Sequence, residues 1–295
     1  MPGEFTRHTV YNLVIASLIF LGGAFYSAAS VQAQEQKQEQ ATAASEKESA
    51  TSTEFSASIV VRDGKRYISG FGVPVHARSN PTAAGIRPSP YAFRVNAKPQ
   101  VTGSPKDWRP GMFFGVALDG VPISAIVASY WEGNAAWPKL EKPQDQFGGA
   151  FIGKGTYVYN GIPAELVEKD LSHIGYAADG FPIFVSRNKK FTSGYRLNEG
   201  RRPKPPLGPG GVYDGQYLSD YSYVPGAGVL DRCNGIKVKN KYYIYVINSE
   251  APVIPPCWSG ATDPSFLKAP VVARPGGVSA SMEGTARNDK LRNMR

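Results

Sequence analysis

The sequence predicts a mainly β protein, a single-domain β-sandwich with long loops and one or two short helices. Gly 32 and Pro 24 make turns frequent and leave little room for long helices. Several segments alternate polar and apolar residues with a period of two, and Asp-Gly pairs that favour tight turns interrupt them. The 295 residues suffice for one large core or at most two domains.

The expected strands begin at Phe55 and follow one another along most of the chain. A helical pattern is confined to residues 164–171 and 124–132, and no internal repeat of fixed period is evident. The pattern leaves the order of the strands within a sheet open. The strand-like segments are residues 55–76, 90–101, 111–124, 150–163, 175–186 and 241–248.

The N-terminus predicts export. Arg7 and His8 precede an apolar run from Leu13 to Tyr26, and small residues continue to Ala33. This order is typical of a secretory signal peptide covering residues 1–33, cleaved after Ala33. The alternative is an uncleaved signal anchor. Cleavage would place the protein in the periplasm or outside the cell, and the processed chain would not be an integral membrane protein.

Two segments flanking the expected domain are poor in residues that could be buried. Residues 34–54 contain no aromatic residue and are expected to form a disordered linker, and the polar, basic residues 271–295 a disordered tail. The domain itself is expected to span residues 55–270. The net charge of +9 favours non-specific contact with anionic partners, but no arginine-rich run with interleaved aromatics predicts nucleic-acid binding.

Cys233 and Cys257 are the two cysteines of the chain. In an oxidising compartment an even number of cysteines predicts a disulfide, here closing a loop of about 25 residues and contributing about 3 kcal/mol. The alternative, a pair of thiolate metal ligands, lacks a CxxC spacing and a nearby histidine.

Four long segments of the expected domain carry a family resemblance. They occur in the expected order and include the strings GVALDGVPI, IGYAADGFPIF, GPGGVYDG and LDRCNG. Together they resemble the YHYH-domain family of exported bacterial proteins over about residues 70–268. The segments are residues 112–123, residues 155–166 with 173–184, residues 193–235, and residues 242–260.

The resemblance draws attention to two Tyr-X-Tyr-X strands. In the family each strand reads Tyr-His-Tyr-His, which places both histidines on one face, about 7 Å apart. Paired imidazoles suit copper, zinc or acid–base chemistry. The resemblance therefore implies that a former ligand face has become packing here, with an asparagine as its polar remnant. The residues at the four histidine positions are Val158, Asn160, Ile244 and Val246.

A residual metal site is the alternative that the resemblance implies. His76 and His173 match family histidines, and with Asp179 or Asp231 they would form a two-histidine, one-carboxylate site for copper or zinc. The simpler interpretation is that both histidines bond loop backbone and that Asp179 serves its Asp-Gly turn. No other cofactor is expected.

The sequence contains no G-x-S-x-G or H-E-x-x-H motif, so no catalytic residue is predicted. The first hypothesis is a non-catalytic binding or scaffolding domain whose partner is an envelope protein or a polysaccharide. The second is a metal-binding protein or metalloenzyme. The third is a carbohydrate-binding module that presents the loop residues Trp131, Trp137 and Trp258 to a sugar.

Overall fold

The computed structural model divides into two compact parts, Met1–Lys47 and Glu48–Arg295. It describes residues 36–38, 40, 54–108, 111–124, 127–140, 142–153, 155–239 and 241–267. The expected signal peptide, most of the expected linker and all of the expected tail lie outside these residues. The described residues of the first part are helical. No helix in the described ranges has both the length and the apolar character needed to cross a bilayer.

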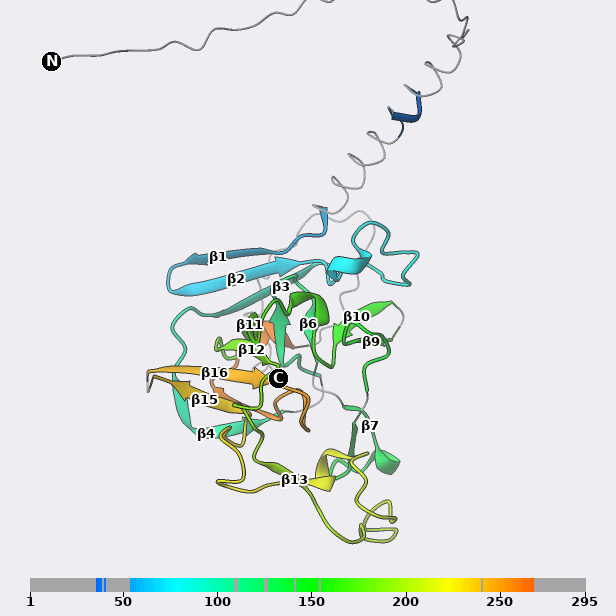
Figure 1. Cartoon of the computed structure of the whole chain (residues 1–295), viewed down its shortest axis with the longest axis vertical. Helices are drawn as coiled ribbons and strands as arrows, with labels where there is room; N and C mark the ends of the chain where they lie inside the picture. The colour runs from blue at the N-terminus through cyan, green and yellow to red at the C-terminus, as the bar shows by residue number, and fades with distance from the viewer. Residues whose placement is uncertain are drawn as a thin grey trace, which may run out of the picture. The chain divides into compact units, whose positions relative to one another are not determined.

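The second part is built mainly of β-strands, which confirms the predicted fold class (Figure 1). Its largest sheet has eight strands. In spatial order they are β15 (Gly235–Val238), β16 (Tyr242–Ile247), β12 (Pro182–Ser186), β11 (Leu171–Ala177), β5 (Gly115–Ala117), β6 (Pro122–Ile123), β10 (Thr156–Tyr159) and β9 (Gly149–Ile152).

Among the described residues, four smaller sheets and five single 3-10 turns complete this part. The sheets are β1 (Ser58–Arg62), β2 (Lys65–Gly70) and β3 (Tyr91–Asn96); β4 (Val101–Asp107) with β17 (Cys257–Gly260); β7 (Val127–Tyr130) with β8 (Pro138–Leu140); and β13 (Tyr195–Leu197) with β14 (Tyr221–Tyr223). The 3-10 turns are η1 (Val75–Ala77), η2 (Trp131–Gly133), η3 (Ala164–Leu166), η4 (Leu218–Asp220) and η5 (Pro264–Phe266).

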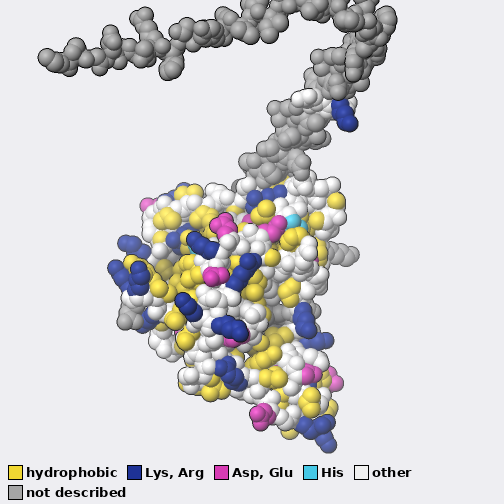
Figure 2. Space-filling view, in the orientation of Figure 1, with side chains coloured by type: hydrophobic (Ala, Val, Ile, Leu, Met, Phe, Trp, Pro, Cys, Tyr) yellow, Lys and Arg dark blue, Asp and Glu magenta, His cyan; other side chains and the backbone are white. Residues whose placement is uncertain are grey.

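One main core joins the three-stranded and eight-stranded sheets. Ile68 of β2 and Phe93 of β3 belong to the same buried cluster as Phe114 and Ile123. Burying each such side chain contributes about 1.5–3 kcal/mol. On the face shown in Figure 2, Lys and Arg side chains are spread out among hydrophobic and acidic ones.

The eight-stranded sheet consists of two copies of one four-strand arrangement. The first repeat has the order β5-β6-β10-β9 and the second has the order β11-β12-β16-β15. In each repeat an antiparallel pair is followed by a parallel pair and then by another antiparallel pair. The repeats meet where β5 pairs antiparallel with β11, and Val116 lies opposite Tyr176. The sheet therefore has an approximate two-fold axis at this pair.

The amino-acid sequence repeats in the same way. Gly115–Ile123 reads GVALDGVPI and Gly175–Ile183 reads GYAADGFPI, sixty positions later (115 against 175). The later strands repeat eighty-six positions apart (149 against 235), and the register of β9 on β10 matches that of β15 on β16. Because the second repeat carries a longer insertion between its two halves, a search for one fixed period misses the relationship.

Neither of the two helices expected from the sequence forms over the predicted residues. Residues 164–171 form one 3-10 turn, η3, and then enter β11 at Leu171. Residues 127–130 form strand β7, because they pair with β8. Glu132 and Gly133 follow with φ values of 46° and 75°, and this left-handed backbone cannot continue a helix. Tertiary pairing thus overrides the local helical pattern.

Candidate functional site

Each Tyr-X-Tyr strand directs two tyrosines toward aspartates, of which one is buried and the other is partly exposed. In the first repeat, Tyr159 donates to Asp119 over 2.7 Å, and Tyr157 donates to Asp145 over 2.7 Å. The second repeat reproduces this arrangement. Tyr245 donates to Asp179 over 2.5 Å and Tyr243 donates to Asp231 over 2.9 Å. All four rings are at most 7% exposed.

The outer carboxylate of each repeat also organises the turn before the neighbouring strand. The Oδ1 of Asp145 accepts from the amides of Phe147 and Gly149, and that of Asp231 accepts from Cys233 and Gly235. Aspartate is common in such turns because its side chain accepts hydrogen bonds from backbone amides two or more residues later in the chain. The glycines are required for a different reason. A Cβ at either position would lie 1.9 Å from a tyrosine hydroxyl oxygen.

Burial sets the protonation of these groups. It raises the pKa of Asp119 and that of Asp179 to about 6, while the tyrosine hydroxyls that donate to them act in the opposite direction. Burial, together with the adjacent carboxylates, raises the pKa of Tyr159 and of Tyr245 well above the ordinary value. The tyrosines are therefore neutral donors at neutral pH.

The four motif positions lie on the opposite faces of the two strands, two on each, and these faces are also buried. Val158 belongs to the main core, whereas Ile244 and Val246 form a second cluster with Leu230. Asn160 is 5% exposed, and its Nδ2 reaches the carbonyl of Lys142 only at 3.4 Å. Its Oδ1 has no hydrogen-bond partner among the described residues.

The motif positions of the two repeats lie on strands that are far apart. Four strands, β6, β5, β11 and β12, separate β10 from β16 in the sheet. Neighbouring strands are about 4.8 Å apart, so roughly 24 Å separates the two faces. Whatever residues occupy these positions, the two strands form two separate local environments.

His76 is bound to a carboxylate at the surface of the first repeat. Its Nδ1 lies 2.8 Å from Glu165 Oε2, and its backbone amide donates to the same oxygen over 3.1 Å. The ring stacks on Phe147 with centroids 3.8 Å apart. The same carboxylate oxygen thus contacts both the ring and the backbone of His76. The ring is therefore held in one orientation.

His173 lies in a different environment, on β11. Its Nε2 is 3.0 Å from the carbonyl of Gly175, and its ring contacts those of Tyr176 and Phe184. Burial lowers the pKa of His173 below the ordinary value, which favours the neutral ring. Within the described ranges, no hydrogen bond or ion pair joins His173 to His76 or to the predicted aspartates.

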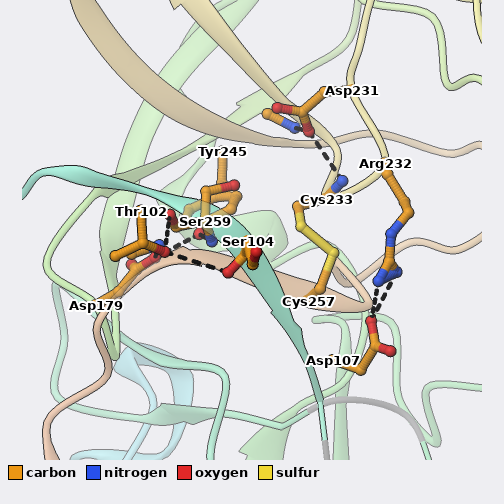
Figure 3. The surroundings of a disulfide bond; sticks show 12 residues. Thr102, Ser104, Asp107, Asp179, Asp231, Arg232, Cys233, Tyr245, Cys257 and Ser259 are labelled. Atoms are coloured by element: carbon orange, nitrogen blue, oxygen red, sulfur yellow. Dashed lines mark hydrogen bonds and ion pairs between the residues drawn. A yellow bond between two sulfur atoms is a disulfide. The ribbon is translucent and has the colours of Figure 1, made fainter.

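The two predicted aspartates do share one hydrogen-bonded network. Ser259 bridges them. Its amide donates to Tyr245 over 2.6 Å (Figure 3), and its hydroxyl lies 2.6 Å from that of Tyr243. Asp179 also accepts from the amide of Gly260 over 2.9 Å. Among the residues described, no group of three or more His, Cys, Asp or Glu side chains is placed to hold a metal ion.

The predicted disulfide between Cys233 and Cys257 is confirmed. It joins the turn before β15 to β17, beside an ion pair between Arg232 and Asp107 (Figure 3). The bond fixes β17 over the second repeat, where Ser259 and Gly260 meet the Tyr245–Asp179 pair.

The tryptophans proposed for sugar binding are mostly packed inside. Trp258 is 1% exposed and donates to the carbonyl of Phe114. Trp137 is 7% exposed and donates to the carbonyl of Leu207. Of the three, Trp131 alone is partly exposed.

Sequence reasoning missed Asp145 as a tyrosine partner and Glu165 as the partner of His76. The repeat supplies a signal for the first of these residues. Asp145 precedes Tyr157 by the same interval as Asp231 precedes Tyr243. No comparable signal identifies Glu165, because its contact with His76 joins segments 89 positions apart.

Fold and site together define an internally repeated β-sandwich in which each repeat holds a buried Tyr-X-Tyr strand against two aspartates. The sequence model of the YHYH protein family matches residues 92–260, and the chain belongs to this family. The resemblance seen in the sequence is thereby confirmed. Neither the curated proteins nor the solved structures include a match to this chain.

Proposed function

We propose that this member of the YHYH family is an exported, non-catalytic binding or scaffolding domain of the cell envelope. The observation that carries the proposal is the burial of all four motif positions, none of which is more than 6% exposed. Three of them are aliphatic and pack in hydrophobic clusters. A ligand could reach these positions only by displacing core side chains, which costs several kcal/mol.

The other face of the motif strands supports the same conclusion. Every motif tyrosine already donates its hydroxyl proton to an aspartate within the protein. The pairs fix the strands against the turns that precede them. These hydrogen bonds therefore stabilise the fold, and it is the protein surface that would bind a partner, either an envelope protein or a polysaccharide.

Export is supported by two independent features. The N-terminal 33 residues have the pattern of a cleaved signal peptide. The disulfide is of a kind that persists in oxidising compartments. The intact mass of the protein recovered from its host compartment would test cleavage after Ala33, because retention of the leader would contradict it.

Metal content distinguishes the proposal from its main alternative. The protein, purified from its compartment without refolding, should contain no stoichiometric copper or zinc by mass spectrometry. Its thermal unfolding should be unchanged after treatment with a chelator. About one metal ion per chain, lost on chelation together with thermal stability, would overturn the non-catalytic proposal.

A metal site remains the second candidate because of one observation. In many metal sites, a carboxylate bonded to the ring nitrogen that does not bind the metal orients the ligating histidine. Glu165 contacts Nδ1 of His76 in this way. If metal is found, His76→Ala and His173→Ala should each remove it. An unchanged metal content in both variants would exclude the site built from His76, His173, Asp179 and Asp231.

A further inference from the structure

Strand β1 is exposed on both of its faces. Its five residues are all exposed, and Ile59, Val60 and Val61 are 37%, 51% and 58% exposed. Ile59 lies opposite the buried Ile68 of β2, so this side of β1 faces the same way as the core side of the sheet. The strand therefore extends past the body of the protein with apolar side chains on both faces. Figure 2 shows hydrophobic side chains at the surface where Figure 1 draws β1.

The outer edge of β1 is an unprotected sheet edge. Within the described ranges β1 pairs only with β2. It contains no proline or bulge, the usual devices against edge-to-edge pairing, and its one charged residue, Arg62, stands at the end of the strand. The other edge of the same sheet differs, because η5 covers β3 and Ser265 bonds both the amide and the carbonyl of Arg94.

The hairpin fixes which backbone groups point outward. Asp63 and Gly64 form a two-residue turn with φ values of 51° and 69°, so Arg62 and Lys65 are the first hydrogen-bonded pair. Bonding to β2 alternates along the strand, so the amides and carbonyls of Ile59 and Val61 point to the free edge.

This edge is complementary to itself. In an antiparallel pairing of two copies centred on Val60, Ile59 of one copy faces Val61 of the other, and each pair exchanges two backbone hydrogen bonds. Arg62 then faces Ser58 of the other copy. The turn with the basic residues Arg62 and Lys65 approaches the start of the partner strand, and the acidic Glu54 lies exposed just before that start. A parallel pairing would instead bring the Arg62 residues of both copies to the same end of the interface. The charges thus select the antiparallel arrangement.

We propose that β1 is the interface for a second copy of this chain. Two copies pair antiparallel about a two-fold axis at Val60 and join their three-stranded sheets into one sheet of six strands. A symmetric dimer of this kind is the commonest oligomer of soluble proteins. The interface lies outside the repeats and the tyrosine–aspartate pairs, so it does not depend on the function proposed above.

A cross-link tests the geometry directly. On the axis, the two copies of residue 60 form a non-hydrogen-bonded pair, whose Cα atoms are about 4.5 Å apart, near enough for a disulfide. In the full chain as its host processes it, Val60→Cys should give a covalent dimer on non-reducing gels that reductant removes. Val212→Cys is the matched control, since Val212 is 52% exposed and lies outside β1.

The mass in solution gives the second readout. Light scattering should show a dimer for the unaltered protein and a monomer for Val61→Pro, which removes an amide that points to the free edge but leaves those bonded to β2. Circular dichroism should show the same fold in both. A monomeric unaltered protein, a dimer that persists in Val61→Pro, or equal cross-linking by Val60→Cys and Val212→Cys would overturn the proposal.

Discussion

Asp119 and Asp179 occupy equivalent places in the two repeats and have the same unusual environment. Each is buried, accepts one tyrosine hydroxyl, and has a pKa raised to about 6. A carboxylate in an unfolded chain has a pKa of about 3.9. The folded protein therefore holds the proton more tightly than the unfolded chain does.

This difference predicts a pH dependence of stability. The stabilisation from each group is fully present below about pH 4 and is lost as the pH rises through about 6. The shift corresponds to an upper limit of ~3 kcal/mol per group. In Asp119→Asn, the change in unfolding free energy between pH 5 and pH 8 should be smaller than in the unaltered protein. Urea unfolding at the two pH values measures this.

The exposed Asp63 provides a control, because Asp63→Asn keeps an Asn-Gly pair suited to the same turn. Its pH dependence should match that of the unaltered protein. If Asp119→Asn behaves in the same way as this control, Asp119 is already ionised throughout the range, and the predicted proton uptake does not occur.

Gly149 and Gly235 should be intolerant of any side chain. Alanine at either position would bring a methyl group to 1.9 Å from a buried tyrosine oxygen, which is already hydrogen-bonded to an aspartate. We expect Gly149→Ala and Gly235→Ala each to lower the free energy of unfolding by about 3 kcal/mol or more. Chemical denaturation measures the loss.

Gly103→Ala is the matched comparison, because a Cβ there meets no atom within 4 Å. It should change the free energy of unfolding by less than about 1 kcal/mol. Equal effects of all three substitutions would mean that loss of glycine flexibility, and not the clash with tyrosine, determines the result.

At the scale of elements, β17 depends on the disulfide for its position over the second repeat. The two cysteines are 24 positions apart in sequence, and a bond that closes such a loop contributes about 3 kcal/mol. Replacing both cysteines with alanine should lower the free energy of unfolding by about this amount. Reductant should destabilise the unaltered protein similarly and leave the double variant unchanged. Equal stability of the two proteins without reductant would contradict the prediction.

The elements also show what the sequence could and could not predict. The alternation in residues 55–76 and the Asp63-Gly64 pair predicted the β1–β2 hairpin, because register there depends on local geometry. The pattern at residues 124–132 predicted a helix, because its apolar spacing fits both periods and only the partner strand β8 decides between them. The disulfide was predictable from two cysteines, whereas the contact of His76 with Glu165 depends on tertiary structure alone.

At the scale of the whole molecule, the insertions of the two repeats meet each other. The first repeat inserts β7 and β8 between β6 and β9, and the second inserts β13 and β14 between β12 and β15. Lys139 forms a bridge with Tyr217, and the Trp137 and Tyr217 rings are 5.9 Å apart. Strand order and this contact were beyond prediction, because residues far apart in sequence determine both.

The repeat also places one difference at a single equivalent position. Phe147 precedes Tyr157 by the same interval as Cys233 precedes Tyr243. The segment that covers the first is attached by a stacked histidine, and the segment that covers the second is attached by a covalent bond. The two repeats can therefore be compared directly. A substitution in one repeat has a counterpart in the other. The effect of a non-covalent attachment on stability can therefore be compared with that of a covalent one within a single chain.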